Sequence, residues 1–256
     1  MTNSRWTESE LEKSLDQMDL HDGDFVFIHS NLGISGSCER GIPEEVILRT
    51  IKARVGAEGC IFLPAFTYSI GQGQVFNPLL MVDKATMGAL SGYAFQEKSP
   101  RSNDPMFSVI GIGTQAVDIF ASQLNRSFGK GSLFSLLLEK QVKMISINTG
   151  AGGTIIHEME NVLAVPYRFE KTFEGRRIDP VTSRVEDVTW TSYVRDLSDP
   201  SSEADFLELT KRLYAKEIWK KWRLGKGYIA VASAGEVFDF LVQEIKTDPR
   251  LLTKDR

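Results

Sequence analysis

A histidine and two glutamates at helical spacing are the residues of this chain best suited to chemistry. His157, Glu158 and Glu160 follow three closely spaced glycines in the stretch TGAGGTIIHEMEN. Residues three and four positions apart share one face of a helix, so Glu160 and Asn161 are expected beside His157. An imidazole titrates near neutral pH, and a carboxylate orients it and stabilises its charged form. The stretch therefore predicts either a general base with an acidic partner or a helix start with a solvated acidic face.

The elements around this stretch place it at the end of a strand. The apolar run 142–147 predicts a buried strand, and the glycines after it predict a turn. A helix is expected to start near Thr154 and to end at Pro166. In α/β proteins, the loop between a strand and the following helix is a usual place for functional residues.

Strands and helices alternate through most of the remaining chain. Short apolar runs predict strands at 25–29, 61–66, 107–112 and 228–232. Periodicity and capping residues predict helices at 7–18, 43–55, 87–97, 115–124, 133–140, 204–222 and 234–246. Pro64 indicates an edge strand or a bulge, and the alternating residues 171–194 predict exposed antiparallel strands. We therefore expect a mixed α/β fold, with a central mixed or parallel sheet flanked by helices and a β-rich insertion after residue 170.

Composition narrows the class of protein and of partner. The net charge of −4 argues against nucleic acid or an anionic membrane as the main partner. Cys38 and Cys60 are expected to be reduced thiols in a cytoplasmic protein. The polar N-terminus is unlike a signal peptide, and no apolar run approaches the roughly 20 residues that span a bilayer. The three histidines lack HxxxH spacing and the cysteines lack CxxC spacing, so we expect no metal.

Small and polar residues also gather in loops beside the other expected strands. These loops contain His29 to Leu32, Thr67 with Tyr68, Asp104, and Gly129 to Gly131. No GxGxxG follows the first strand, and there is no Walker loop or GxSxG, so the usual nicotinamide, nucleoside-triphosphate and serine-hydrolase motifs are absent. Each loop by itself can also be explained without a function, as a structural histidine, a turn or a solvated basic residue.

Taken together and in order, these loops resemble the aminoglycoside 3-N-acetyltransferase family. Its His-Ser-Ser-Leu, Pro-Thr-Phe-Thr and Met-Gly-Ala-Leu motifs are matched by His29 to Leu32, Pro64 to Thr67, and Met87 to Leu90. Its Arg-Ser-x-His-Pro-x-x-Ser, Gly-x-Gly-Ser and Thr-x-x-His-x-x-Glu motifs are matched by Arg101 to Ser108, Gly129 to Ser132, and Thr154 to Glu160. The resemblance implies a fold distinct from the GNAT enzymes. It also implies one acyltransferase domain over 1–256, with a family core at 22–169, a substrate-side β-rich insertion at 170–200 and a C-terminal helix–strand–helix at 204–246.

One departure from the family pattern bears on the substrate. Asp104 stands where the drug-modifying members have histidine, and Asp-Pro-x-Phe-Ser looks like the branch of surface-polysaccharide pathways, including the N-acyltransferase of anthrose biosynthesis. This implies an acyl-CoA-dependent N-acyltransferase that acylates a nucleotide-linked deoxyamino sugar in lipopolysaccharide O-antigen or other surface-polysaccharide biosynthesis. The alternative is an aminoglycoside 3-N-acetyltransferase. A hypothesis outside the enzymes is a non-catalytic protein that binds CoA or a nucleotide sugar.

The resemblance also implies roles for individual residues. His157 is the expected general base, Glu158 or Glu160 its partner, and Asp104 either a base or a ligand of the sugar amine. Acetyl-CoA or another acyl-CoA is the expected co-substrate, with no metal, and a homodimer is possible. The residues expected to bind the co-substrate are His29, Ser30, Asn31, Leu32, Thr67, Ser108, Gly129, Lys130, Gly131 and Ser132. Those expected to bind the amino sugar are Tyr68, Asp104, Phe107, Tyr167 and Arg168.

Overall fold

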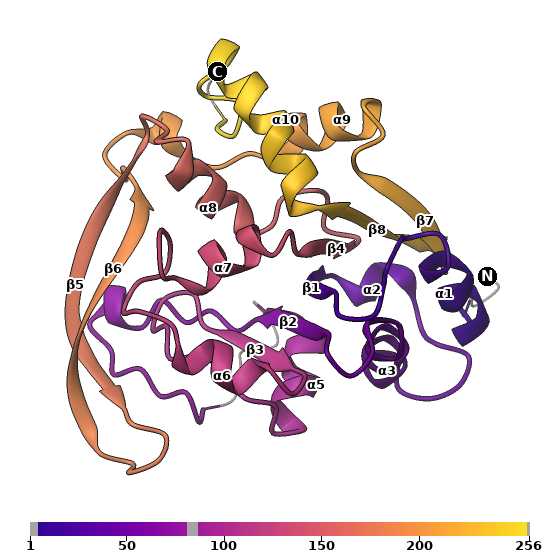
Figure 1. The fold of residues 1–256 in the computed structure, drawn as a ribbon, viewed down its shortest axis with the longest axis horizontal. Helices are drawn as coiled ribbons and strands as arrows, with labels where there is room; N and C mark the ends of the chain where they lie inside the picture. The colour runs from indigo at the N-terminus through magenta and orange to yellow at the C-terminus, as the bar shows by residue number, and fades with distance from the viewer. Residues whose placement is uncertain (1–4, 81–86, 255–256) are drawn as a thin grey trace.

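A mixed sheet runs through the middle of the molecule (Figure 1). The structure, a computed structural model, describes residues 5–80 and 87–254, and within them the sheet has six strands. In order across the sheet these are β3 (Val109–Ile112), β2 (Cys60–Pro64), β1 (Phe25–Ser30), β4 (Lys143–Ile147), β8 (Gly227–Ser233) and β7 (Lys220–Leu224). Strand β1 pairs in parallel with β2 and β4, and the other pairs are antiparallel. The expected mixed α/β fold is confirmed.

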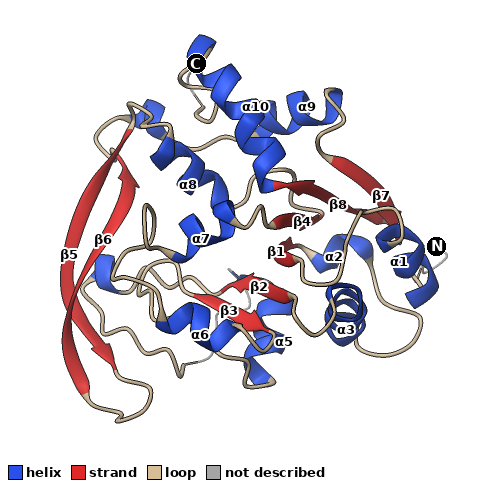
Figure 2. Ribbon diagram, in the orientation of Figure 1, coloured by secondary structure: helices blue, strands red, loops and turns tan. Residues whose placement is uncertain are grey.

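Helices cover both faces of this sheet (Figure 2). One face is covered by α1 (Glu8–Leu15), α3 (Pro43–Val55) and α5 (Ala89–Gln96). The other is covered by α6 (Ala116–Ala121), α7 (Leu133–Glu139), α8 (Ile155–Val162), α9 (Leu207–Ala215) and α10 (Ala234–Thr247). The short helices α2 (Leu32–Ser35), η1 (Ile70–Gln72) and η2 (Pro200–Ser202) lie in connections. Among the described helices, none has both the length and the apolar character needed to cross a membrane.

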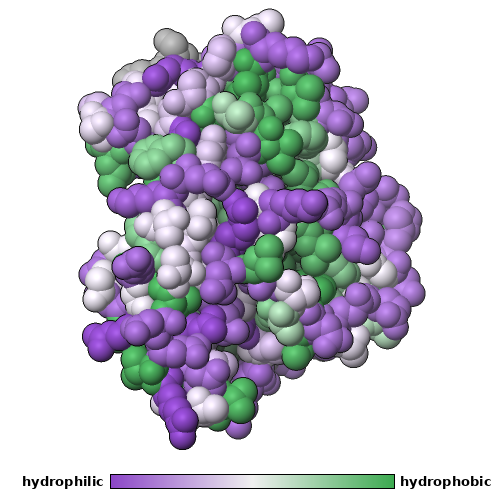
Figure 3. Space-filling view, turned by 60° about the vertical axis from the view of Figure 1, so that its left-hand side comes forward, coloured by the Kyte–Doolittle hydropathy of each residue, from purple (hydrophilic) through white to green (hydrophobic). Residues whose placement is uncertain are grey.

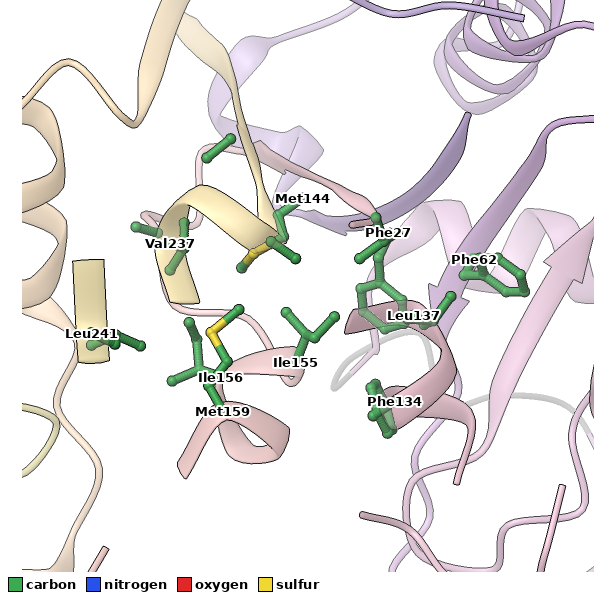
Figure 4. Close-up of a cluster of buried hydrophobic side chains, with 14 of the residues drawn as sticks. Phe27, Phe62, Phe134, Leu137, Met144, Ile155, Ile156, Met159, Val237 and Leu241 are labelled. Atoms are coloured by element: carbon green, nitrogen blue, oxygen red, sulfur yellow. The ribbon is translucent and has the colours of Figure 1, made fainter. Parts of the chain in front are cut away.

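Side chains of the central strands alternate between two hydrophobic clusters, one on each face of the sheet. In β1, Phe25 and Phe27 enter the cluster that contains α7, α8 and α10, whereas Val26 and Ile28 enter the cluster that contains α3. Figure 4 shows part of the first cluster, in which side chains of α7 and α8 lie near Phe27. Truncating a buried phenylalanine such as Phe27 to alanine is expected to cost about 3–5 kcal/mol. Because Ile155, Ile156 and Met159 lie in this cluster, helix α8, which carries His157, packs against the sheet through its apolar face.

A long two-stranded ribbon stands apart from the main sheet, at the left of Figure 1. Strand β5 (Arg168–Ile178) pairs antiparallel with β6 (Val185–Arg195), from Arg168 opposite Arg195 to Ile178 opposite Val185. Isolated bridges from Phe76 to Arg177 and from Arg126 to Thr191 tie the ribbon to loops of the main body. The antiparallel strands expected at 171–194 are present, and each extends further than predicted.

Two local predictions are wrong. Strand β2, which ends at Pro64, is an interior strand, because it pairs with β1 on one side and β3 on the other. Pro64 is tolerated there because a proline at the end of a strand interrupts few hydrogen bonds.

The prediction of a single helix over 204–222 is also wrong. Helix α9 ends at Ala215, Glu217 takes a left-handed φ of 56°, and the chain continues as β7. The C-terminal part is therefore helix–strand–strand–helix, not helix–strand–helix. The aromatic residues of this segment fit helical spacing, but its second half pairs with β8 in a hairpin. Gly225 has a left-handed φ of 59°, which suits the turn of that hairpin.

Candidate active site

The turn between β4 and α8 depends on glycines where other residues do not fit. Gly150 has a left-handed φ of 74°, and a Cβ on Gly152 would lie 2.4 Å from the ring of Phe206. Because β1 and β4 are parallel neighbours, this turn lies beside the end of β1. Helix α8 begins directly after the turn and carries His157 in its first turn. The predicted arrangement of strand, glycine turn and helix is present.

His157 pairs with Glu160 and not with Glu158. The Nδ1 of His157 lies 2.6 Å from Oε2 of Glu160, three residues further along α8. Glu160 also accepts a hydrogen bond of 2.9 Å from the hydroxyl of Tyr167. Arg168 Nε lies 2.7 Å from the same Oε2 as an ion pair, although its N–H does not point at that oxygen. We call Glu160 with His157, Tyr167 and Arg168 the carboxylate cluster.

Burial and charge together set the protonation of this cluster. Burial lowers the pKa of His157, and the positive charge of Arg168 lowers it further, against the opposing charge and hydrogen bond of Glu160. Burial would raise the pKa of Glu160, but the donors around it outweigh burial and hold that pKa below its ordinary value. At neutral pH the carboxylate is therefore ionised and the imidazole neutral. With Nδ1–H donated to Glu160, Nε2 of His157 has a free lone pair that can accept a proton.

Glu158 points to a different neighbour. Its Oε2 accepts the backbone N–H of Gly129 at 2.6 Å, inside the protein. Burial raises the pKa of Glu158 to about 7. Gly129 has a left-handed φ of 85°, and a Cβ there would lie 2.7 Å from the guanidinium of Arg126. Glu158 therefore holds the glycine loop against α8, whereas the ring of His157 is paired with Glu160.

His157 lies on the wall of a cavity of about 750 Å³, a volume typical of small-molecule sites. Its side chain is 17% exposed. The aromatic residues that line the cavity are Tyr68, Phe107, Phe169, Phe173 and Tyr193. The charged residues that line it are Arg168, Lys171, Arg195, Asp196 and Glu203. Figure 3 views the molecule with the side of the β5–β6 ribbon brought forward, where hydrophilic and hydrophobic residues are interleaved.

The residues predicted to bind the sugar divide into two groups. Tyr68, Phe107 and Arg168 line the cavity with His157. Tyr167 does not, because it is buried and its hydroxyl is used by Glu160. The structure gives Tyr167 a contact with Glu160, and its predicted contact with the substrate stays a prediction.

Asp104 is also buried and does not line the cavity. Its Oδ1 accepts the backbone N–H groups of Met106 and Phe107 at 2.8 and 2.9 Å, and burial raises its pKa to about 6. Its Oδ2 makes no hydrogen bond of good geometry among the described residues, although the Ser127 hydroxyl lies close enough to lower the pKa of Asp104. In this structure Asp104 shapes the turn that presents Met106 and Phe107 to the cavity, so neither of its predicted roles is supported by a direct contact.

The residues predicted to bind the co-substrate lie outside this cavity. His29 is the residue before the last one of β1, and its Nε2 lies 3.3 Å from the backbone nitrogen of Thr154. Burial, with His157 nearby, lowers its pKa to about 4. Such a neutral ring accepts this hydrogen bond at the start of α8. Next to it in the chain, Ser30 and Leu32 are partly buried and Asn31 is exposed.

Two of the serines predicted to bind the co-substrate have partners within the protein. Ser108 is fully buried, donates to the carbonyl of Ala65 at 2.5 Å and accepts from Arg101. Ser132 is buried and caps α7, where it accepts the N–H of Ser135 at 3.0 Å. Both hydroxyls are therefore used by the fold, and their predicted contacts with the co-substrate stay predictions.

The other predicted co-substrate residues are placed as follows. The Thr67 hydroxyl donates to the carbonyl of Pro105 at 3.0 Å. Lys130 and Gly131 are exposed, whereas Gly129 is buried against Glu158. None of the residues Gly129 to Gly131 lines the cavity that contains His157.

Several cavity residues were not singled out by the sequence. They are Lys171, Phe173, Arg195, Asp196 and Glu203. The alternating pattern of 171–194 predicts strands, but it does not tell which ribbon residues face another part of the protein. That depends on how the ribbon packs against loops distant in sequence. Over the described residues, no group of three histidine, cysteine or acidic side chains is arranged to hold a metal ion.

Comparison with known proteins gives the family. The family model described as aminoglycoside 3-N-acetyltransferase matches residues 27–246. A search of curated protein sequences finds no match.

The fold is shared with several solved acetyltransferases. AAC-VIa bound to sisomicin has a TM-score of 0.77 at 19% identity, covering 95% of this chain and 98% of that chain. AAC(3)-Xa has a TM-score of 0.76 at 17% identity, covering 94% of this chain and 92% of that chain. AAC-IIIb in a binary complex with CoASH has a TM-score of 0.76 at 18% identity, covering 94% of this chain and 97% of that chain.

The family match covers most of the chain, and the shared fold agrees with it. The resemblance inferred from the ordered motifs is confirmed, and so is the enzyme class of N-acetyltransferase. The chain belongs to the aminoglycoside 3-N-acetyltransferase family.

Proposed function

We propose that the protein transfers the acetyl group of acetyl-CoA to an amine of an amino sugar, with His157 as general base. The observation that carries this proposal is the pair of His157 and Glu160 on the wall of a 750 Å³ cavity, in a chain of this family. A solved neighbour is a complex with CoASH and another a complex with sisomicin, which supports this donor and an aminoglycoside as the first acceptor to test.

The cluster geometry suits direct transfer. An ammonium group is not nucleophilic, so the acceptor must lose a proton before it attacks. Nε2 of His157 takes this proton, and Glu160 stabilises the imidazolium through Nδ1–H. The amine nitrogen forms a bond to the thioester carbonyl carbon and the carbon–sulfur bond breaks. The attacking nitrogen loses its second proton to solvent as the amide forms, and the imidazolium returns the first proton to the leaving thiolate. An ammonium acceptor and acetyl-CoA therefore give the amide, CoASH and one released proton.

The acceptor expected from the sequence was a nucleotide-linked deoxyamino sugar. The comparisons favour the alternative, an aminoglycoside, because the family description and the neighbour with sisomicin both concern aminoglycosides. The nucleotide-linked sugar stays a prediction that rests on the motif around Asp104.

A thiol-release assay with acetyl-CoA tests the proposal. The acceptor panel contains kanamycin, gentamicin and dTDP-, GDP- and UDP-linked amino sugars. The matched variants are His157→Ala and His21→Ala, since His21 is exposed in a turn next to Asp19, outside the cavity. We expect His157→Ala to lower kcat by about a hundredfold or more, as for loss of a general base, and His21→Ala to leave it unchanged. Near-normal turnover by a folded His157→Ala variant would rule out the proposed role.

A further inference from the structure

The cavity wall contains acidic residues, but their carboxylates already have partners. Oδ1 of Asp196 accepts the backbone N–H of Ser198 at 2.9 Å and its hydroxyl at 2.6 Å. Oε1 of Glu203 lies 2.8 Å from the ammonium of Lys254, and Arg195 nearby adds to the lowering of the pKa of Glu203. Each of these acids therefore has at least one partner within the protein.

Two basic residues of the same wall have no such partner. In the described part of the chain, Lys171 and Arg195 lie within ion-pair distance of no carboxylate, whereas Arg168 is used by Glu160. Lys171 Nζ lies 5.1 Å from the centre of the Phe173 ring. Both unpaired cations line the cavity that contains His157.

The register of the ribbon brings positive charges together. Arg195 is the direct cross-strand partner of Arg168, and like charges placed opposite each other destabilise a sheet. Lys171 is three residues from Arg168, so its side chain leaves the opposite face of the ribbon from those of Arg168 and Arg195. Residues of both faces line the cavity, and Lys171 and Arg195 therefore border it from two sides.

We propose that Lys171 and Arg195 form an anion subsite for a phosphate group carried by the acceptor, so that the acceptor is a phosphorylated amino sugar. This inference rests on the proposed acetyl transfer. Charge-assisted hydrogen bonds from lysine and arginine are the usual means of binding phosphate. The rings of Phe107, Phe169 and Phe173 on the same cavity offer apolar faces to the sugar between the phosphate and His157.

Two ligands carry phosphate groups that such a subsite would bind, the acceptor and the CoA donor, and the experiment distinguishes between them. The test variant is Lys171→Gln combined with Arg195→Gln. The control is Arg176→Gln, an exposed arginine of the same ribbon that does not line the cavity. Acceptors are glucosamine 1-phosphate and glucosamine, compared by thiol release with acetyl-CoA. Binding of inorganic pyrophosphate is measured by calorimetry in the same variants.

We expect the wild-type protein to bind pyrophosphate and to prefer glucosamine 1-phosphate over glucosamine. The double variant should weaken pyrophosphate binding about tenfold or more and remove that preference, with the KM for acetyl-CoA unchanged. Arg176→Gln should resemble the wild type. A rise in the KM for acetyl-CoA instead would assign the cations to the CoA phosphates and overturn the proposal.

The remaining outcomes are also decisive. Pyrophosphate binding that is absent from the wild type, or equal in all variants, would mean that Lys171 and Arg195 are solvated and would overturn the subsite. Pyrophosphate binding that depends on both residues, without acetyl transfer to any amine, would uphold the subsite while the proposed function fails. Transfer to kanamycin with no effect of the double variant would uphold the function while the subsite fails.

Discussion

The carboxylate cluster and the β5–β6 ribbon meet at one cavity but are built in opposite ways. The cluster takes its side chains from 157–168, a short stretch of chain, and its central carboxylate has no exposed surface. The ribbon gives the cavity exposed or half-buried residues such as Lys171 and Phe169. Under the proposed function, proton transfer depends on a buried, local arrangement, whereas the choice of acceptor depends on a surface whose residues can change without disturbing the core.

This comparison makes a kinetic distinction between the two regions. Losing an interaction that acts in the transition state lowers kcat for every acceptor. Losing a contact that binds the acceptor equally in both states raises KM for that acceptor and leaves kcat unchanged. Substitutions in the cluster should follow the first pattern and those in the ribbon the second.

The largest expected effect is that of Glu160→Gln. An amide at this position removes the negative charge that stabilises the imidazolium, and it can donate to Nδ1 so that Nε2 carries the proton. We expect kcat to fall by about a hundredfold or more with every acceptor. Thiol release at saturating acetyl-CoA measures the change.

Glu158→Gln is the matched control, because it makes the same chemical change two residues away on the same helix. Its amide oxygen can still accept the N–H of Gly129. We expect kcat within a few-fold of wild type. If Glu158→Gln loses as much activity as Glu160→Gln, the assignment of the partner from the hydrogen bond to His157 is mistaken.

The position of this partner shows what the sequence specifies well. His157 and Glu160 are three residues apart on one helix, so spacing alone brings them together, but Glu158 was equally possible until the turn of the helix was known. Tyr167 and Arg168 follow the helix, and their return to Glu160 depends on the chain bending near Pro166. Helical spacing therefore predicts which residues of one helix meet, but it does not predict the direction in which the chain bends after the helix ends.

Longer-range features were harder to predict for the same reason. The segment 204–222 fits helical periodicity, yet its second half pairs with β8 as strand β7. Ser108 matches a family motif, yet its hydroxyl is buried against Ala65. In both cases the deciding partner lies elsewhere in the chain, so a pattern read over a few residues identifies the segment without its contacts.

The next effect in size concerns stability and pH. The pKa of Glu158 rises from 4.5 to about 7 in the folded protein because of burial. Between these values the unfolded chain has lost this proton while the folded protein keeps it, so rising pH favours unfolding. The shift corresponds to at most about 3 kcal/mol, and solvent screening reduces it.

Glu158→Gln should remove this contribution. We expect the wild-type free energy of unfolding, relative to the variant, to fall by about 1–3 kcal/mol between pH 4.5 and 7. Urea unfolding at a series of pH values measures it, and Glu174→Gln, on the exposed ribbon, is the control. Asp104, whose pKa is about 6, contributes equally to wild type and variant and cancels. Parallel curves for wild type and Glu158→Gln would show that burial does not hold a proton on Glu158.

The smallest expected effect, in the ribbon, tests the other half of the comparison. Phe169 is 48% exposed and lines the cavity, so its ring contributes apolar surface to the acceptor site without supporting the core. We expect Phe169→Ala to raise the acceptor KM by about threefold to tenfold, because partial loss of such burial costs about 1 kcal/mol, while kcat is kept. Val185→Ala, at the exposed far end of the ribbon, should change neither constant. A fall in kcat for Phe169→Ala with unchanged KM would mean that the ribbon helps to place the amine for attack, and the separation between chemistry in the cluster and selection in the ribbon would not hold.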